Sequence, residues 1–170
     1  MKSLKEALLN RPENIDVAEM VAEEYIKANY TVEGKLTFET VNGVCIVNCD
    51  GDVGVKNIKI EKLTDGFVWG EVKGHFYCTH CEKLETLEGA PKYVGGHFYC
   101  QYCKNLKSLK GAPKEVGRDF YCTGCTKLES LEGAPEEVGE YFYCYGCRKL
   151  KSLKGAPKKV KGIGCDKRLK

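Results

Sequence analysis

The sequence contains no long apolar run and no strong excess of charge of one sign. A transmembrane helix needs about 20 consecutive apolar residues, and no stretch approaches that length, so we expect no membrane span. With 27 Lys and Arg against 24 Asp and Glu, the net charge of +3 provides no general attraction to nucleic acid or to a membrane surface. Nucleic acid is therefore not an expected partner.

The first residues, "MKSLKEALLNRPEN", are charged and lack the apolar core of a secretory signal. We therefore expect a cytoplasmic protein. In a reducing compartment, cysteines serve in a core, at a metal or in redox chemistry more often than in disulfides.

Few residues are suited to catalysis. The three histidines, His75, His80 and His97, all lie in or beside the strands of a repeat. Residues 30–71 contain no Ser/His/Asp set, no paired carboxylates and no phosphate-binding loop. Asp50 and Asp52 are interpreted as turn residues, because the rest of a calcium loop is missing. We expect no enzyme, no catalytic residue and no cofactor.

What the sequence does contain is 11 cysteines and a repeat of 22 residues. From Val72 onward the frame V-x-x-x-F-Y-C-x-x-C-x-x-L-x-[ST]-L-x-G-A-P occurs four times. Self-similarity at this period predicts stacked units that bury their apolar faces only against their neighbours. We expect four repeats over 72–159 and a truncated capping repeat over 160–170.

The Cys-x-x-Cys pairs have two interpretations. They are Cys78/Cys81, Cys100/Cys103, Cys122/Cys125 and Cys144/Cys147. Two adjacent pairs fit the spacing of a zinc site, and thiolates are good zinc ligands. However, every pair is equally far from the next, and Val, Phe and Leu are as periodic as the cysteines. We favour small buried thiols in a core and keep zinc binding as the alternative.

The frame resembles the leucine-rich repeat, with F-Y-C-x-x-C in place of L-x-L-x-x-[N/C]. It is similar to short repeats of bacterial effectors and of phage-encoded proteins that read F-x-C-x-x-N. The resemblance implies an α+β fold with a parallel leucine-rich repeat solenoid of about four 22-residue repeats. Phe98 and Cys100 would then point inward, and Cys103 would face the backbone of the adjacent coil. It also implies a binding role and a phage or prophage setting.

The N-terminal residues are expected to cap this solenoid. Over 1–31 we expect a helical cap, with capping residues at Ser3/Glu6 and Asp16/Glu19 and an apolar stripe that includes Val17, Val21 and Tyr25. Over 32–71 we expect an antiparallel β flanking region. Its turns are predicted at Asn42-Gly43, Asp50-Gly51 and Asp65-Gly66.

Charged residues at equivalent positions of the repeats alternate in sign. The two columns are Glu85, Lys107, Glu129 and Lys151, and Glu88, Lys110, Glu132 and Lys154. Stacking would place opposite charges side by side, each exposed pair stabilising the stack by roughly 0.2–1 kcal/mol.

The residues on either side of the inward Phe and Cys should face outward on the concave sheet surface. Tyrosines recur there, and tyrosine gives a large contact area at low entropic cost. We therefore predict a non-enzymatic protein-binding module. Its predicted partner-binding residues are His75, Tyr77, His97, Tyr99, Asp119, Tyr121, Tyr141, Tyr143 and Tyr145.

Overall fold

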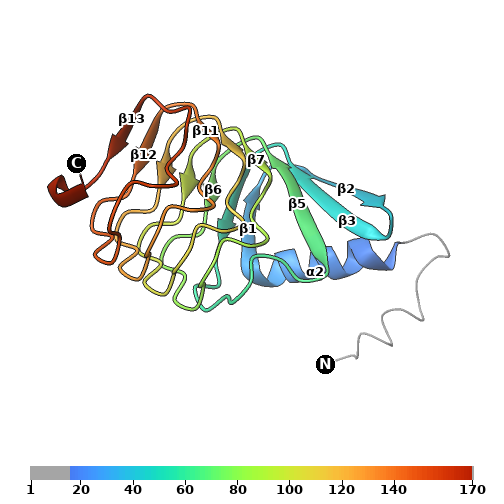
Figure 1. The fold of residues 1–170 in the computed structure, drawn as a ribbon. Coiled ribbons are helices and arrows are strands. Elements are labelled where there is room, and N and C mark those ends of the chain that lie inside the picture. Colours follow the sequence, from blue (N-terminus) through green and yellow to red (C-terminus); the bar gives the residue numbers. More distant parts are fainter. Residues whose placement is uncertain (1–15, 170) are drawn as a thin grey trace.

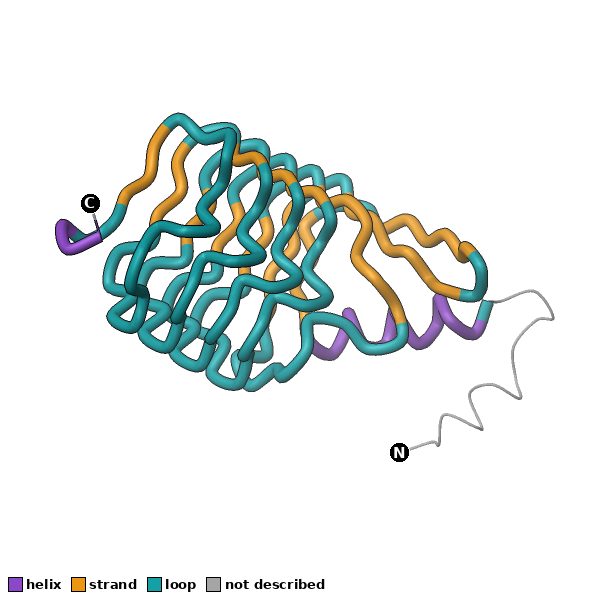
Figure 2. Tube along the Cα trace, viewed as in Figure 1, coloured by secondary structure: helices purple, strands orange, loops and turns teal. Residues whose placement is uncertain are grey.

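The computed structural model describes residues 16–169, which form one helix, a hairpin and a stack of parallel coils (Figure 1). The capping box expected at Ser3 and Glu6 lies outside the described residues. Figure 2 shows that loops and turns make up most of each coil, while the strands are short. The α+β solenoid expected from the sequence is confirmed in this architecture.

Helix α2 spans Val17–Asn29 and begins at Asp16, whose carboxylate accepts a hydrogen bond from the Ala18 N–H at 2.9 Å. The sequence predicts this cap. The buried residues of α2 are Met20, Ala22 and Ile26, whereas Val17 is 54% exposed. The prediction that Val17 belongs to the buried apolar stripe was therefore wrong. The helix instead directs the face that carries Met20, Ala22 and Ile26 toward the strands that it contacts.

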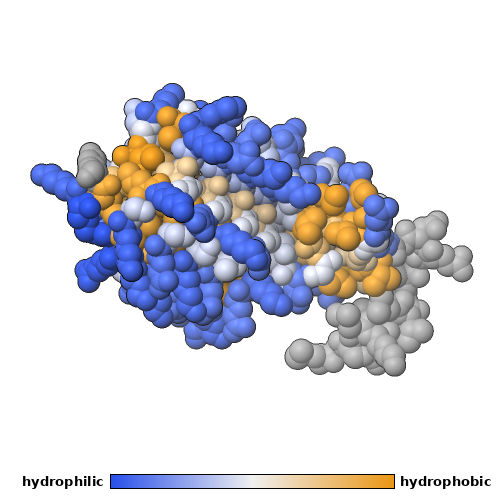
Figure 3. Space-filling view, in the orientation of Figure 1, coloured by the Kyte–Doolittle hydropathy of each residue, from blue (hydrophilic) through white to orange (hydrophobic). Residues whose placement is uncertain are grey.

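Strands β2 (Leu36–Val41) and β3 (Val44–Cys49) form an antiparallel hairpin. Its turn residues Asn42 and Gly43 have φ of 51° and 76°, as a two-residue hairpin turn requires. The hairpin predicted at Asn42-Gly43 is confirmed. Val41 and Val44 are 41% and 44% exposed there, and Figure 3 shows hydrophobic side chains gathered over this end of the molecule.

The other two predicted turns do not form hairpins. Strand β4 (Asp52–Val55) follows Asp50-Gly51 but lies in a different sheet from β3, where it pairs antiparallel with β1 (Tyr30–Glu33). Strand β5 (Phe67–Val72) follows Asp65-Gly66 and pairs in parallel with β3. The meander of successive hairpins expected for this region was thus wrong beyond β2 and β3, although β1 and β4 also pair antiparallel, because the chain here already follows the coil geometry.

Each coil contributes one short strand to each of two sheets. The seven-stranded sheet has the order β1-β4-β6-β8-β10-β12-β13, and the six-stranded sheet has the order β11-β9-β7-β5-β3-β2. Equivalent residues of successive coils pair in register, as Phe98 does with Phe120. The remaining strands are β6 (Phe76–Tyr77), β7 (Tyr93–Val94), β8 (Phe98–Tyr99), β9 (Glu115–Val116), β10 (Phe120–Tyr121), β11 (Glu137–Val138), β12 (Tyr141–Tyr143) and β13 (Gly162–Gly164).

The parallel stacking begins before the cysteine frame does. Cys45 pairs with Phe67, and Val53 pairs with Phe76, so the chain around β3, β4 and β5 forms a further coil. Val53 and Leu63 are fully buried in it. Val53 occupies the place that Phe holds in later coils, so this coil fills the same core with different residues.

The core is built of columns that run along the stack. Neighbouring Phe rings of the column from Phe76 to Phe142 lie 5.4, 5.0 and 5.1 Å apart, with their planes within 9°. Cysteine, leucine and valine columns pack around it. Phe and Cys therefore point inward as predicted, and stability comes from contacts between neighbouring coils.

The last coil ends in a capping segment. The 3₁₀ helix η1 (Lys167–Leu169) follows β13 and places the Arg168 guanidinium against the carbonyl oxygens of Cys147 and Leu150. The Asp166 carboxylate accepts a hydrogen bond from the Gly146 N–H at 3.2 Å. Asp166 thereby satisfies an N–H group that the next coil satisfies elsewhere in the stack, as the Tyr145 carbonyl oxygen does for Gly124.

Candidate binding face

The outward side of the seven-stranded sheet carries a column of tyrosines. Because side chains alternate along a strand, the residue between an inward Phe and an inward Cys must point outward. These residues are Tyr77, Tyr99, Tyr121 and Tyr143, which we call the tyrosine column. All four are half-buried.

The rings of the tyrosine column are stacked. Neighbouring ring centroids lie 4.8, 4.9 and 4.9 Å apart, and the ring planes differ by 3°, 5° and 12°. The in-register pairing of parallel strands imposes this spacing, which is the distance between strands in a sheet. Each ring covers the face of the next, so stacking fixes the rotamers of the tyrosine side chains in the unbound protein.

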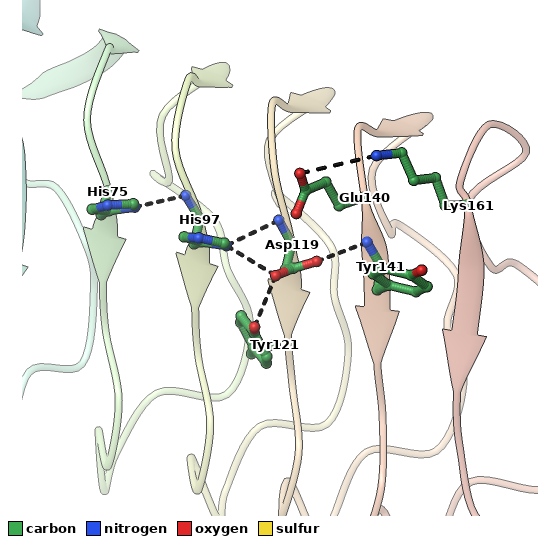
Figure 4. Close-up of polar contacts among 7 residues, drawn as sticks. All are labelled: His75, His97, Asp119, Tyr121, Glu140, Tyr141 and Lys161. Carbon is green, nitrogen blue, oxygen red and sulfur yellow. Dashed lines mark hydrogen bonds and ion pairs between the residues drawn. The ribbon is translucent and has the colours of Figure 1, made fainter.

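A second column beside the tyrosines ties the coils together. Its members are Asp52, His75, His97, Asp119 and Tyr141, and each of the first four accepts a hydrogen bond from the backbone N–H of the next. The donor–acceptor distances are 2.7, 2.8, 3.1 and 2.8 Å. We call this the His–Asp ladder, and Figure 4 shows it from His75 to Tyr141. The ladder satisfies backbone N–H groups at the starts of the short strands β6, β8, β10 and β12.

Asp119 links the His–Asp ladder to the tyrosine column. Its Oδ2 atom accepts a hydrogen bond from the Tyr121 hydroxyl at 2.8 Å and lies 3.2 Å from His97 Nδ1. Burial, and then the hydrogen bond to Asp119, raise the pKa of Tyr121. Burial lowers the pKa of His97, although the charge of Asp119 opposes that shift. The hydrogen bond that His97 Nδ1 accepts in the ladder therefore requires a neutral imidazole.

The structure places all nine predicted partner-binding residues in or directly beside the strands of this one sheet. Tyr141 and Tyr145, near the C-terminal end of the sheet, are 44% and 45% exposed. Each packs on Tyr143, at ring distances of 6.0 and 6.5 Å. His75, His97 and Asp119, in contrast, have acceptor atoms engaged by the backbone. Their binding role stays a prediction.

The structural role of the His–Asp ladder was not predicted from the sequence. The signal was present, since Asp52, His75, His97 and Asp119 each have a short side chain able to accept a hydrogen bond, at a spacing of 22 or 23 residues. Also unpredicted are Thr31, Glu33, Asp52 and Gly54, which extend the same face toward the N-terminus. Their strands, β1 and β4, carry no repeat frame.

Behind the face, the second cysteine of each pair after the first bonds to the preceding coil, whereas the Cys81 thiol donates to the Thr79 carbonyl oxygen of its own coil. The thiols of Cys103, Cys125 and Cys147 donate hydrogen bonds to the carbonyl oxygens of Cys78, Cys100 and Cys122, over 3.0, 3.1 and 3.2 Å. The predicted inward placement of Cys103 against the adjacent backbone is confirmed. We call these contacts the thiol ladder. All 11 cysteines are buried and unpaired.

The first thiol of each pair is held in an environment that disfavours thiolate. Burial raises the pKa of Cys78, Cys100 and Cys122 well above the ordinary thiol range. Contact with the Cys103 thiol, and then burial, raise the pKa of Cys81. Over residues 16–169, no three His, Cys, Asp or Glu side chains are grouped so that they could hold a metal ion. Zinc needs deprotonated cysteine, and burial disfavours that state in the first cysteine of each pair. Hydrogen bonds with the Cys81 and Cys122 thiols lower the pKa of Cys103 and Cys147 instead.

The charge columns lie in loops, outside the strands of both sheets. Lys107 pairs with Glu85 at 2.8 Å and Lys110 pairs with Glu88 at 2.8 Å, as predicted. Glu129, however, pairs at 3.0 Å with Lys149, which lies two residues before the expected partner Lys151. All these pairs are exposed, so each has a small effect on stability.

No helix within residues 16–169 has both the length and the apolar character needed to cross a membrane. Comparison of the chain with protein-family models, with curated proteins and with solved structures gives no match. The geometry of the tyrosine column and its surroundings is therefore the basis for assigning a function.

Proposed function

We propose that this protein is a non-enzymatic binding module that recognises a partner protein through the outward side of its seven-stranded sheet. The tyrosine column is the centre of this surface, and Tyr141 and Tyr145 extend it toward the C-terminus. As part of the same proposal, the coils are of the leucine-rich repeat type, and the protein acts in the cytoplasm in a phage or prophage setting.

The observation that carries the proposal is the order of the tyrosine column. Stacking at 4.8–4.9 Å fixes the side chains in the unbound protein. Binding then costs little additional side-chain entropy, which otherwise opposes association by about 0.5–1.5 kcal/mol for each immobilised side chain. Tyrosine also offers both apolar contact and a hydroxyl, a combination enriched at protein interfaces.

The charges near the column favour a protein over a nucleic acid. Glu33, Asp52 and Asp119 all lie in or beside the strands of the sheet that carries the tyrosines. Phosphate groups are repelled by carboxylates, and stacking platforms for single strands rely on a positively charged groove. A protein surface that offers positive charge and apolar contact fits these groups better.

The test is affinity capture from a lysate of the source organism, with quantitative mass spectrometry. The Y99A/Y121A variant removes the middle of the tyrosine column, while the inward core residues stay in place. The matched control is Tyr93→Ala, because Tyr93 is a half-buried tyrosine on the other sheet. We expect specific partners to be lost from Y99A/Y121A and retained by Tyr93→Ala. Equal capture by both variants, with unchanged circular dichroism, would refute the proposal.

A further inference from the structure

The two ends of the tyrosine column differ. At the C-terminal end, Tyr143 is in register with Gly164, and the space above this glycine is filled by aromatic rings. A Cβ atom on Gly164 would lie 2.6 Å from the Tyr143 ring and 2.8 Å from the Tyr145 ring. Tyr145 thus closes this end of the column.

At the N-terminal end, Tyr77 is in register with Gly54 of strand β4. One face of the Tyr77 ring stacks on Tyr99. On the other side, a Cβ atom on Gly54 would lie 2.9 Å from the Thr31 hydroxyl oxygen and 3.8 Å from the Cβ atom of Tyr77. Among the described residues, no second aromatic ring stacks face to face on Tyr77. The column is therefore open at this end.

A hollow of about 320 Å³ lies at this open end. It is lined by Thr31, Glu33, Asp52, Gly54, Val55 and Tyr77. Thr31 lies opposite Gly54 on the edge strand β1, and its hydroxyl donates to the Gly54 carbonyl oxygen at 3.2 Å. The hollow thus brings together the Tyr77 ring, the Gly54 backbone and the carboxylates of Glu33 and Asp52.

Among the described residues, neither carboxylate of the hollow is ion-paired with a lysine or an arginine. Asp52 uses its Oδ1 atom to accept the His75 N–H at 2.7 Å, which leaves Oδ2 available. Within residues 16–169, no lysine or arginine forms an ion pair with Glu33 or Asp52. Burial raises the pKa of Tyr77, and the charges of Asp52 and Glu33 raise it further. The hollow therefore has a negative potential.

We propose that this hollow binds the guanidinium group of an arginine side chain, stacked on the Tyr77 ring and paired with Glu33 and Asp52. Guanidinium is planar, so it can continue a column of parallel rings, and its donors match carboxylate geometry. A cation over an aromatic face is also attracted by the ring itself. This inference rests on the proposed function, since the arginine belongs to the partner protein, and it names the chemistry of one contact.

The test is an NMR titration of the ¹⁵N-labelled protein with N-acetyl-arginine methylamide at constant ionic strength. We expect saturable shifts of the Gly54 and Tyr77 amide signals. The E33Q/D52N variant removes both charges, and the side-chain amide introduced by D52N keeps an oxygen for the His75 N–H. We expect its affinity for the probe to fall about fivefold or more, because both charge pairs with the guanidinium are lost while the Tyr77 ring stays in place. The matched control is Glu115→Gln, which removes an exposed charge from the other sheet.

Three results would overturn the inference. They are shifts at Gly54 and Tyr77 no larger than elsewhere, an equal response to the neutral citrulline derivative, and an equal response to the lysine derivative. The titration needs no partner, so it can fail separately from the proposed function. Capture that depends on Tyr99 and Tyr121, with no response to the arginine probe, would overturn the guanidinium site alone.

Discussion

The Nδ1 atom of His97 accepts a hydrogen bond from the backbone N–H of Asp119 at 3.1 Å, while the Oδ2 atom of the same Asp119 lies 3.2 Å away. The two contacts require opposite states of one nitrogen. The N–H needs the lone pair of a neutral imidazole, whereas the carboxylate favours a proton on that nitrogen. Protonation of His97 therefore breaks its hydrogen bond with the Asp119 N–H, which joins two coils, and forms an ion pair with the Asp119 carboxylate.

We expect the protein to lose stability as the pH falls below neutral, in part through His97. Burial lowers the pKa of His97 in the folded state from its usual 6.5, so the unfolded chain binds the proton more readily. The stabilising contribution is full above pH 6.5 and is lost as the pH falls through 6.5 toward the lower folded-state pKa. Urea denaturation between pH 7.5 and pH 5 measures it.

The control for this effect is His97→Asn, whose side-chain oxygen can still accept the Asp119 N–H but does not titrate. Other groups also respond to pH, so the informative quantity is the difference between the two proteins. We expect a weaker loss of stability in His97→Asn. Identical pH profiles would show that His97 does not contribute.

The thiol ladder gives a second prediction. Cys103 is fully buried, and its thiol donates to the Cys78 carbonyl oxygen at 3.0 Å. Cys103→Ala should lower the free energy of unfolding by about 1–3 kcal/mol, because it leaves a buried carbonyl without this donor and removes a packed sulfur. Cys103→Ser keeps a donor and should lose less. Urea denaturation under reducing conditions distinguishes the two variants, and equal losses would contradict a hydrogen-bonding role.

Most of the core could be predicted from the sequence because it is periodic. Phe76, Cys78 and Cys81 recur in every repeat, and each recurrence is an independent indication that the position faces inward. The extra coil around β3 and β4 could not be predicted in this way. Stacking requires only an inward side chain of suitable volume. Val53 therefore fills the position that Phe76 fills in the next coil, and no repeat motif marks Val53 in the sequence.

The second sheet and the His–Asp ladder escaped prediction for other reasons. Strands such as β9 are two residues long, too short to show an alternating pattern. His75 and Asp119 are outward residues of variable type, a pattern that predicts a binding surface. Only the pairing of coils shows that they also accept backbone hydrogen bonds.

We expect the purified protein to contain much less than one zinc ion per repeat and to keep its circular dichroism in EDTA. The buried first cysteines favour the thiol form, and thiols such as Cys125 already donate to carbonyl oxygens. Elemental analysis before and after chelation measures both quantities. Stoichiometric zinc, with unfolding on its removal, would instead establish metal-dependent folding.

The capping segment supplies the last prediction. The Arg168 guanidinium donates to the Cys147 carbonyl oxygen at 2.7 Å and also to that of Leu150, which joins the capping segment to the last full coil. Arg168→Ala should expose these carbonyls and increase amide hydrogen exchange in β12 and β13, while exchange in β6 stays unchanged. Arg168→Lys should give an intermediate effect, because an ammonium group lacks the planar fork that reaches two acceptors. The control is Lys167→Ala, since Lys167 is exposed in the same turn. Exchange that rises equally in Lys167→Ala would show that the turn, and not the guanidinium, closes the stack.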